Sequence, residues 1–459
     1  MDVCVIGAGH VGLVTAACLA EKGHHVVCVD VDEAKVAAVN AGSTFLYEPG
    51  LEDLVRRNST ARRLSATTDL RAAVVEAEIS LVTVPVPLER VANEALEPLR
   101  HVCRGIGEAL AGRERFHAVV VKSTTLPGTT SNVVAPLLEE VSSRKAGRDF
   151  GVGANPEFLT EGEAIDDFMR PDRLVLGAGD PRTLQALEDL YRDFDGERIR
   201  TNPTTAEMIK LASNALLATM ISFSNEFANV AAALGDVDVV DVMRGVHLSR
   251  YLTPPSDSGA KRTAPLAAYL EAGCGFGGSC LPKDVAGLSD FAARLGAPMQ
   301  LLEAVTAVNR SRAAELVELA KGDLDTLDGV RVSVLGLAFK PDTDDVRESP
   351  AFPVVERLLS EGAEVRVYDP IAQQAFLDRF SSGELSPAKD LDDAVLNADV
   401  VVIVTRWRQF ERIPEILSGR EDPPVVIDGR RMLDRAMLTR YSGIGLGRKL
   451  GGGVDGASR

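Results

Sequence analysis

The chain has 459 residues, more than one hydrophobic core ordinarily organises, so two or three domains are expected. Hydrophobic residues make up 45% and charged residues 25% of the sequence, which is ordinary for a globular protein. The formal net charge of -17 argues against a nucleic-acid-binding protein, which would present a basic face to phosphates, but it leaves room for an anionic ligand in a local basic pocket.

Cysteine usage and the N-terminus indicate the cellular setting. The six cysteines have no regular spacing and form no CxxC pair, so we expect neither disulfides nor a zinc site, and a reducing, cytoplasmic location fits. The apolar N-terminus carries Asp2 and GAGHVG and has no basic segment, so a buried strand and helix explain it better than a signal peptide. No membrane-spanning stretch is predicted.

The N-terminal residues predict a βαβ unit. Residues 3–6 form a short β-rich run, residues 13–21 have a helical pattern that Gly23 closes, and residues 25–30 form the next strand. Residues 79–84 and 118–122 are further candidates for buried strands. Continuous apolar strands predict a parallel sheet that helices cover on both faces.

The same pattern of elements returns near residue 331. Residues 332–336 read as a strand that enters a turn, and residues 351–359 read as the helix that follows. Residues 365–369 end in aspartate as the earlier strand does, and residues 398–405 resemble residues 78–83. The repeat predicts an α/β fold with two doubly wound Rossmann-like domains joined by a long central helix.

Residues 204–234 predict that central helix, because breakers are few and apolar residues follow helical spacing. Its apolar faces indicate either a homodimer contact or burial within the chain, and the pattern favours neither. Residues 253–265 read as an inserted loop. The predicted domains are an N-terminal Rossmann-like domain, a central helical domain with a cysteine loop, a C-terminal Rossmann-like domain and a disordered tail, at residues 1–202, 203–310, 311–442 and 443–459.

Gly7, Gly9 and Gly12 form G-x-G-x-x-G between a predicted strand and a predicted helix. The first two glycines allow the backbone to approach a pyrophosphate, and the third allows the helix to pack on the strand. Asp30 ends the next strand, where a carboxylate accepts from the ribose hydroxyls of NAD and repels the extra phosphate of NADP. The pattern therefore predicts NAD as cofactor. Lys35 lies either near the adenosine or in solvent.

Cys280 follows GFGGS and precedes a probable helix start, where the helix dipole favours a thiolate. Lys283 adds positive charge, and Asp284 lies one turn after the thiol. A small buried thiol in a tight turn is the plain alternative, but the glycines and the Lys-Asp pair favour a nucleophile. The other five cysteines are interpreted as structural.

Several motifs together resemble the UDP-glucose/GDP-mannose dehydrogenase family over nearly the whole chain. They are GAGHVG, STTLPGT from Ser123, NPEFLTEG from Asn155, Lys210 with Asn214, GFGGSCLPKD from Gly275, and GLAFK from Gly336 with TDDVRESP from Thr343. The resemblance implies two successive hydride transfers to NAD, which turn the C6 alcohol of a nucleotide sugar into a carboxylate. Cys280 matches the family nucleophile, which forms a thiohemiacetal and then a thioester.

The resemblance also implies roles for other residues. Lys210 and Asn214 would surround the reacting C6 oxygen, and Asp284 would act as base or position water. Thr124 would hold the catalytic water. Cofactor contacts are expected at Val11, Thr83, Thr124, Glu161, Lys283 and Arg347, besides the glycines, Asp30 and Lys35. Substrate contacts are expected at Phe158, Leu159, Lys210, Asn214, Arg250, Tyr251, Gly277, Phe339, Lys340 and Arg430, and Glu157 is the expected acid or base.

The nucleotide base is the weakest point of the match. The segment of residues 253–273 looks longer than in many family members, and the sequence gives this insertion no role. Arg250, just before it, matches only loosely the arginine that a partner subunit sends to the substrate in the family. We expect UDP-glucose as substrate and UDP-glucuronate as product, with TDP-glucose and GDP-mannose as alternatives. Two rival hypotheses are a simple two-electron dehydrogenase and an inactive nucleotide-sugar-binding protein; GFGGSCLPKD and the intact polar residues oppose them.

Overall fold

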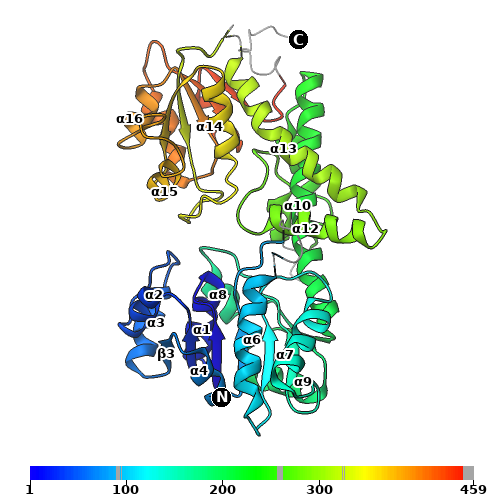
Figure 1. The fold of residues 1–459 in the computed structure, drawn as a ribbon. Helices are drawn as coiled ribbons and strands as arrows, with labels where there is room; N and C mark the ends of the chain where they lie inside the picture. Colours follow the sequence, from blue (N-terminus) through cyan, green and yellow to red (C-terminus); the bar gives the residue numbers. More distant parts are fainter. Residues whose placement is uncertain (89–93, 95, 256–261, 323, 325, 448–459) are drawn as a thin grey trace. The chain divides into compact units, whose positions relative to one another are not determined.

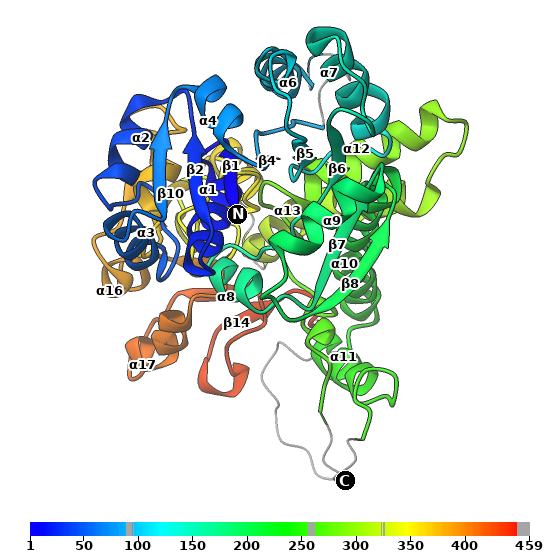
Figure 2. The same cartoon turned by 90° about the horizontal axis from the view of Figure 1, so that it is seen from below.

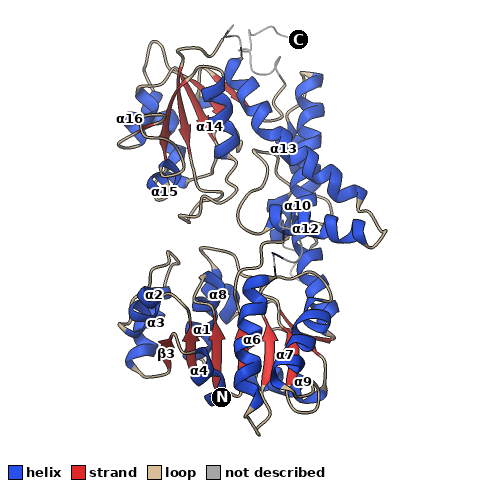
Figure 3. Ribbon diagram, viewed as in Figure 1, coloured by secondary structure: helices blue, strands red, loops and turns tan. Residues whose placement is uncertain are grey.

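The computed structural model describes the chain except for residues 89–93, 95, 256–261, 323, 325 and 448–459. The chain divides into two compact units, Met1–Ser213 and Asn214–Arg459, and each is built on its own β-sheet (Figures 1 and 3). Helix α10, Pro203–Leu234, contains the boundary between the units. Within the described residues, no helix combines the length and the apolarity that crossing a membrane requires.

The first unit contains an eight-stranded sheet with the order β3-β2-β1-β4-β5-β6-β7-β8. Its first six positions follow the strand order of the doubly wound dinucleotide-binding fold. Neighbouring strands are parallel except for the antiparallel pair β6–β7. The strands are β1 Asp2–Ile6, β2 His25–Val29, β3 Leu64–Thr67, β4 Ile79–Val82, β5 Ala118–Val121, β6 Gly151–Ala154, β7 Arg173–Ala178 and β8 Glu197–Thr201.

Several helices of the first unit begin at aspartate side chains. Asp32, Asp69 and Asp180 each accept from an N–H in the first turn of the helix that follows, which satisfies donors that the helix itself leaves free. Helices α6 and α7 pack against each other (Figure 2). The helices are α1 His10–Glu21, α2 Glu33–Asn40, α3 Leu51–Thr60, α4 Leu70–Glu76, α6 Glu97–Ala111, the π-helical turn η1 Thr130–Val134, α7 Ala135–Ser142, α8 Ala164–Met169 and α9 Pro181–Leu190.

The second unit repeats the strand order in a six-stranded sheet, β11-β10-β9-β12-β13-β14, in which every neighbouring pair is parallel. Its strands are β9 Arg331–Leu335, β10 Glu364–Tyr368, β11 Ser386–Pro387, β12 Val400–Ile403, β13 Val425–Asp428 and β14 Tyr441–Gly443. Its helices, besides the end of α10, are α11 Val239–His247, η2 Pro265–Tyr269, α12 Leu281–Arg294, α13 Gln300–Lys321, α14 Ala351–Ser360, α15 Gln373–Leu377, α16 Leu391–Leu396, η3 Arg408–Arg412, α17 Ile413–Leu417 and η4 Arg435–Met437.

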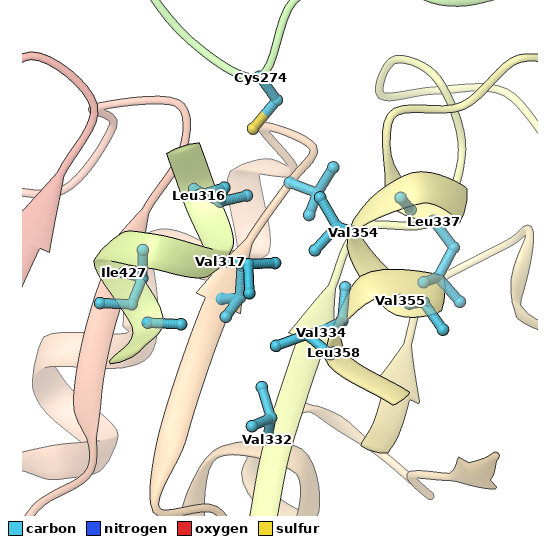
Figure 4. Packing of buried hydrophobic residues seen from close by; sticks show 14 of the residues in the cluster. Cys274, Leu316, Val317, Val332, Val334, Leu337, Val354, Val355, Leu358 and Ile427 are labelled. Atoms are coloured by element: carbon cyan, nitrogen blue, oxygen red, sulfur yellow. The ribbon is translucent and has the colours of Figure 1, made fainter. Parts of the chain in front are cut away.

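The core of the second unit lies between β9 and the helices α13 and α14. Val332 and Val334 of the strand belong to one buried cluster with Leu316 and Val317 of α13 and Val354 of α14 (Figure 4). Burial of each such side chain stabilises the fold by about 1.5–3 kcal/mol. Helix α13 therefore contributes to the C-terminal core.

The fold prediction is confirmed: the α/β chain carries two doubly wound sheets and a long helix from Pro203 to Leu234. The predicted boundary between residues 310 and 311 lies inside α13. The disordered tail was predicted to begin too early, because Ile444 and Leu446 are buried and Leu446 pairs with Asp238. Residues 448–459 of that prediction, and residues 256–261 of the predicted insertion, lie outside the described residues.

Candidate active site

The loop after β1 has the geometry of a phosphate-binding turn. Gly7 has a φ of +104°, which favours glycine. A Cβ on Gly12 would lie 1.8 Å from the Gly7 carbonyl oxygen, so α1 packs this closely only without a side chain there. A Cβ on Gly9 would meet no atom within 4 Å, and no side chain caps the start of α1. The first-turn N–H groups therefore fit the pyrophosphate of NAD.

Two predicted cofactor residues flank this turn. The Thr83 hydroxyl lies 2.8 Å from the Ile6 carbonyl oxygen and 2.9 Å from that of Gly7, so Thr83 supports the loop from the end of β4. Val11 is half-buried in the first turn of α1. The structure thus gives Thr83 a definite task in shaping the turn.

Asp30 lies beside the glycine turn, as predicted. Its Oδ2 accepts from the Ala8 N–H at 2.7 Å, and its Oδ1 accepts from the Asp32 N–H at 3.0 Å. Each carboxylate oxygen has a second acceptor direction, so ribose hydroxyls can still donate to Asp30. The Lys35 Nζ lies 3.6 Å from Asp30 Oδ2 and 5.5 Å from the centre of the Phe45 ring, which places Lys35 at this site.

Sequence reasoning missed Glu48, which joins the glycine turn to the segment NPEFLTEG. Its Oε2 lies 2.8 Å from His10 Nε2 and accepts from the Gly162 N–H at 2.8 Å, and its Oε1 accepts from the Ala164 N–H at 3.0 Å. Burial alone would raise the pKa of Glu48, but these partners hold it below its ordinary value. Glu48 lies 38 residues from His10 in sequence, so no local pattern indicates the contact.

Lys210 forms a buried ion pair with Glu157, the predicted acid or base. Lys210 Nζ lies 3.1 Å from Glu157 Oε1, and the Leu159 N–H donates to Glu157 Oε2 at 2.6 Å. Burial alone would raise the pKa of Glu157, but the Lys210 ammonium and the Leu159 N–H hold it below its ordinary value. Two cations lie close to the Phe158 ring centre, Lys210 Nζ at 5.4 Å and the Arg173 guanidinium at 3.9 Å. Arg173 was not predicted.

A second buried lysine, Lys122, also escaped the sequence analysis. Its Nζ donates to Asn155 Oδ1 at 3.0 Å and lies 3.4 Å from the Tyr191 hydroxyl, whose hydrogen donates to the same Asn155 oxygen at 2.5 Å. Burial lowers the pKa of Lys122 to about 8, although Glu157 acts in the opposite direction. Lys122 thus fixes the side chain of Asn155, the first residue of NPEFLTEG, by a buried hydrogen bond.

The remaining predicted residues of the first unit lie on the loop that contains STTLPGT and on the segment NPEFLTEG. Thr124 is half-buried between Ser123, which donates to the Val84 carbonyl oxygen at 2.6 Å, and the buried Thr125. Glu161 is half-buried in the turn before α8. The structure therefore brings Thr124, Glu157, Glu161 and Lys210 onto neighbouring parts of one unit.

Cys280 is the exposed cysteine of the chain, and the other five are buried. Burial raises the pKa of Cys4, Cys18, Cys28 and Cys103 to about 12, and that of Cys274 to about 11, so these thiols stay protonated at neutral pH. Cys280 was predicted to lie near a helix start, and it occupies the N-cap of α12, with its Sγ 3.6 Å from the Ser279 hydroxyl. The thiol therefore combines access with the positive end of a helix.

Asp284 lies one turn after Cys280 and is buried. Its Oδ2 accepts from Asn214 Nδ2 at 2.6 Å, and its Oδ1 accepts from Lys283 Nζ at 2.5 Å. The Asp284 N–H donates to the Cys280 carbonyl oxygen at 2.9 Å. The second unit thus brings together three predicted catalytic residues. Asp284 contacts Asn214 through the amide of that side chain and Cys280 through the first-turn backbone hydrogen bond of α12.

The glycines of the cysteine loop are required by close contacts. A Cβ on Gly277 would lie 2.0 Å from the Glu348 carbonyl oxygen, and one on Gly278 would lie 2.7 Å from the Phe339 ring. The Gly278 N–H donates to the Arg347 carbonyl oxygen at 3.0 Å. The loop therefore packs directly on the segment after β9 that carries the predicted substrate residue Phe339.

Asn309, which was not predicted, clamps the cysteine loop from α13. Its Oδ1 accepts from the Phe276 N–H at 2.8 Å, and its Nδ2 donates to the Phe276 carbonyl oxygen at 3.0 Å. On the other side, Arg430 Nη1 donates to the Gly275 carbonyl oxygen at 3.3 Å and Nε donates to that of Val404 at 2.6 Å. Arg430 therefore helps to shape the loop, in addition to the predicted substrate role.

The other predicted residues of the second unit lie near the surface. Arg347 is exposed and pairs with Asp345 at 2.7 Å, and Lys340 Nζ lies 5.9 Å from the Phe339 ring centre. Arg250 and Tyr251 follow α11, and Tyr251 is 96% exposed. No contact that the structure describes brings these two residues to the cysteine loop.

Asp369 directly follows β10 as Asp30 directly follows β2, but the hydrogen bonds of the two side chains differ. Its Oδ2 accepts from the Leu337 N–H at 2.7 Å and from Trp407 Nε1 at 3.0 Å, and its Oδ1 accepts from the Ala372 N–H at 2.8 Å. Asp369 is buried, so its side chain completes the turn instead of facing a ribose. The dinucleotide-binding geometry belongs to the first unit.

The glycine turn between β1 and α1, with the Asp30 carboxylate beside it on a doubly wound sheet, defines the first unit as the dinucleotide-binding domain of a dehydrogenase. Three family models match in chain order: the UDP-glucose/GDP-mannose dehydrogenase family NAD binding domain at residues 1–195, its central domain at residues 204–311 and its UDP binding domain at residues 333–435. The chain belongs to this family and is an NAD-dependent nucleotide-sugar dehydrogenase.

Known proteins of the family resemble the chain along almost its whole length. A UDP-glucose 6-dehydrogenase of Haloferax volcanii is 38% identical over 95% of this chain and 98% of its own length. A GDP-mannose 6-dehydrogenase of Pseudomonas aeruginosa is 37% identical over 88% of this chain and 91% of its own. The solved structure of a UDP-glucose dehydrogenase from Pyrobaculum islandicum has a TM-score of 0.87 at 36% identity, and covers 96% of this chain and 97% of that one.

Proposed function

We propose that the protein oxidises the C6 alcohol of UDP-glucose to the carboxylate of UDP-glucuronate, with Cys280 as covalent nucleophile. The observation that carries the proposal is the exposed thiol at the start of α12, one turn before the buried Asp284 that Asn214 and Lys283 hold. A thiol in this setting can bind an aldehyde between two oxidations, which keeps the reactive intermediate on the protein.

The proposed reaction passes through an aldehyde, a thiohemiacetal and a thioester. The alcohol loses a proton and a hydride to give the C6 aldehyde, and the Cys280 sulfur then adds to that carbon to form a thiohemiacetal. Loss of a second hydride from carbon, together with the hydroxyl proton, gives a thioester, and water breaks the C–S bond to release the carboxylate and restore the thiol. Bound NAD accepts one hydride in each oxidation. The net reaction consumes two NAD and one water for each sugar.

The residues of each unit supply distinct functions to this chemistry. The Lys210 ammonium is suited to stabilise an oxyanion at C6, and Asn214 is suited to orient it, because the two are one turn apart on α10. Glu157, whose pKa lies below the ordinary value, is ionised at neutral pH and can accept a proton. Asp284 and Thr124 are the candidates for placing the hydrolytic water.

UDP is the nucleotide that we favour as the carrier of the sugar. The match of the UDP binding domain model at residues 333–435 and the likeness to the Pyrobaculum islandicum structure support it. GDP-mannose is the alternative that one observation favours, because a GDP-mannose 6-dehydrogenase is 37% identical to the chain, close to the 38% of a UDP-glucose 6-dehydrogenase.

The test counts NADH formed per sugar consumed by the purified protein with NAD and UDP-glucose, with TDP-glucose and GDP-mannose in parallel. We expect two NADH per UDP-glucose and loss of turnover by at least about a thousandfold in Cys280→Ala, because covalent catalysis requires the thiol. Cys103→Ala, which removes a buried thiol from α6, is the matched control and should retain turnover. One NADH per sugar, or full turnover without Cys280, contradicts the thioester route.

We also propose that the protein is a cytoplasmic homodimer that pairs through α10. Phe223, Phe227, Val230 and Leu234 are all exposed and follow one another at spacings of four, three and four residues, so they share one face of the helix. An apolar stripe of this kind on an exposed helix marks a protein contact. The reducing location is supported by six free cysteines.

A further inference from the structure

The carboxylate of Glu207 is buried on α10, one turn before Lys210, and neither the family resemblance nor the proposed mechanism gives it a task. Only 4% of the residue is exposed to solvent. A buried carboxylate is costly unless its oxygens are fully hydrogen-bonded, so its partners indicate why it is there.

Within the part of the chain that the structure describes, the side-chain hydrogen bonds of Glu207 all reach one loop, residues 123–130, which contains Thr124. Oε1 accepts from the Thr125 hydroxyl at 3.1 Å and from the Thr130 N–H and hydroxyl at 2.8 and 2.6 Å. Oε2 accepts from the Gly128 N–H at 2.6 Å. The two backbone N–H groups can only donate a hydrogen bond. A glutamine amide in place of the carboxylate has a single acceptor oxygen, so it could accept from only one side of this arrangement.

Thr124 is thereby held from both sides. On one side the Ser123 hydroxyl donates to the Val84 carbonyl oxygen at 2.6 Å, which ties the loop to the end of β4. On the other side Thr125 and Gly128 are tied to Glu207. The backbone of Thr124 is thus fixed while its own side chain, which is half-buried, stays outside this network.

The same stretch of α10 holds the second catalytic loop. Lys210, three residues after Glu207, pairs with Glu157 at 3.1 Å, and Glu157 lies in NPEFLTEG. One helix turn therefore fixes Thr124 through Glu207 and Glu157 through Lys210. A change at Glu207 alters the distance between two groups of the site without removing either group.

We propose that Glu207 is a positioning residue, which sets Thr124 relative to Lys210 and Glu157 for the oxidation of the nucleotide sugar. This proposal rests on the proposed function. Its consequence is that Glu207→Gln lowers kcat, because the catalytic groups lose their alignment, while KM for NAD and for the sugar nucleotide changes little, because no group of the binding turn is lost.

The experiment compares four variants in steady-state assays with NAD and whichever sugar nucleotide the wild type oxidises. We expect kcat to fall at least tenfold in Glu207→Gln and about threefold in Thr125→Val, with both KM values within threefold of wild type. Thr125→Ser keeps the hydroxyl and should restore kcat. Asp180→Asn is the matched control, because Asp180 caps α9 with three hydrogen bonds to Arg182 and Thr183 but touches no catalytic loop.

Hydrogen exchange gives a second measurement that needs no turnover. The amides of residues 123–130 should exchange at least tenfold faster in Glu207→Gln than in wild type, and at the wild-type rate in Asp180→Asn. Wild-type kcat in Glu207→Gln, or a fall in Thr125→Val that Thr125→Ser shares, overturns the proposal. If Glu207→Gln does not fold, the two Thr125 variants decide. A wild type that oxidises no sugar nucleotide contradicts the proposed function, and the exchange rates then judge the role of Glu207.

Discussion

Lys122 shows how a single buried side chain connects the stability of the protein to pH. It lies beneath Asn155 in a site from which solvent is excluded, and burial lowers its pKa from 10.5 to about 8. The shift means that the folded protein binds the Lys122 proton less tightly than the unfolded chain does. Between pH 8 and 10.5 the unfolded chain therefore holds more protons, and the folded state gains stability as pH rises.

We predict that Lys122→Met removes this pH dependence. The contribution of Lys122 to the free energy of unfolding should rise by about 3 kcal/mol from pH 7 to pH 10.5, since one pKa unit corresponds to about 1.4 kcal/mol. The measurement is urea unfolding of wild type and Lys122→Met at pH 7, 8.5 and 10, with the difference between the two proteins as readout. A difference that stays constant over this range contradicts the lowered pKa.

Residues with a local motif could be singled out from the sequence as candidates, whereas residues that act through distant partners could not. Cys280 could be recognised from its glycines and the helix start, and the structure places it at that N-cap. Glu48 and Asn309 could not, because their partners lie 38 and 33 residues away. Their role arises only when the fold brings a polar side chain to an unpaired backbone group.

At the scale of elements, strands and helices could be predicted closely because their apolar runs have the right period. The predicted helix over residues 204–234 corresponds to α10 at Pro203–Leu234, and the predicted strand over residues 332–336 corresponds to β9 at Arg331–Leu335. The predicted boundary at residue 310 coincides with the end of the central-domain match at residue 311, but it lies inside α13, one continuous helix whose later turns enter the C-terminal core. Periodicity marks elements well, but it does not show which core an element joins.

The cysteine loop carries the proposed nucleophile, and Asn309 holds this loop by both backbone groups of Phe276. We predict that Asn309→Ala destabilises the protein by about 1–3 kcal/mol, because two buried peptide groups lose their partner. The loop should also loosen, so that kcat falls roughly tenfold with the Cys280 thiol intact. Calorimetry and steady-state assays measure the two effects.

Asn397→Ala is the matched control for that experiment. Asn397 also makes two side-chain hydrogen bonds, to the Asp393 carbonyl oxygen at 2.9 Å and to its carboxylate at 2.8 Å, but these bonds are exposed. Its loss should change the free energy of unfolding by less than about 0.5 kcal/mol and leave kcat unchanged. Equal effects of the two substitutions would show that Asn309 has no special hold on the cysteine loop.

The chain as a whole contains two doubly wound sheets with the same strand order. The aspartates that follow the second strand of each sheet, Asp30 and Asp369, make different hydrogen bonds. Asp30 keeps acceptor capacity beside the phosphate turn, whereas Asp369 accepts from Leu337, Ala338 and the Trp407 indole. A strand that ends in aspartate therefore predicts the topology in both units but a ribose contact in only one. The difference depends on Trp407, 38 residues away, which no local motif indicates.

Pairing of two chains through the exposed apolar stripe of α10 can be tested by a substitution within that stripe. Phe227 lies in the centre of the exposed apolar stripe, with its ring 4.8 Å from that of Phe223. We predict that Phe227→Glu weakens self-association by roughly thirtyfold or more, because a charge would have to be buried where an aromatic anchor was, at a cost of about 2 kcal/mol or more. Sedimentation velocity over a range of concentrations measures the dissociation constant.

Met437→Glu provides the control for that measurement, because Met437 is a similarly exposed apolar residue that lies on η4 and not on the stripe. It should leave the dissociation constant within twofold of wild type. If Phe227→Glu and Met437→Glu sediment alike, or if the wild type is a monomer at every concentration, pairing through α10 is wrong. In the second case the stripe must be covered in another way, since exposed aromatic side chains in a row along one helix face favour contact with another surface.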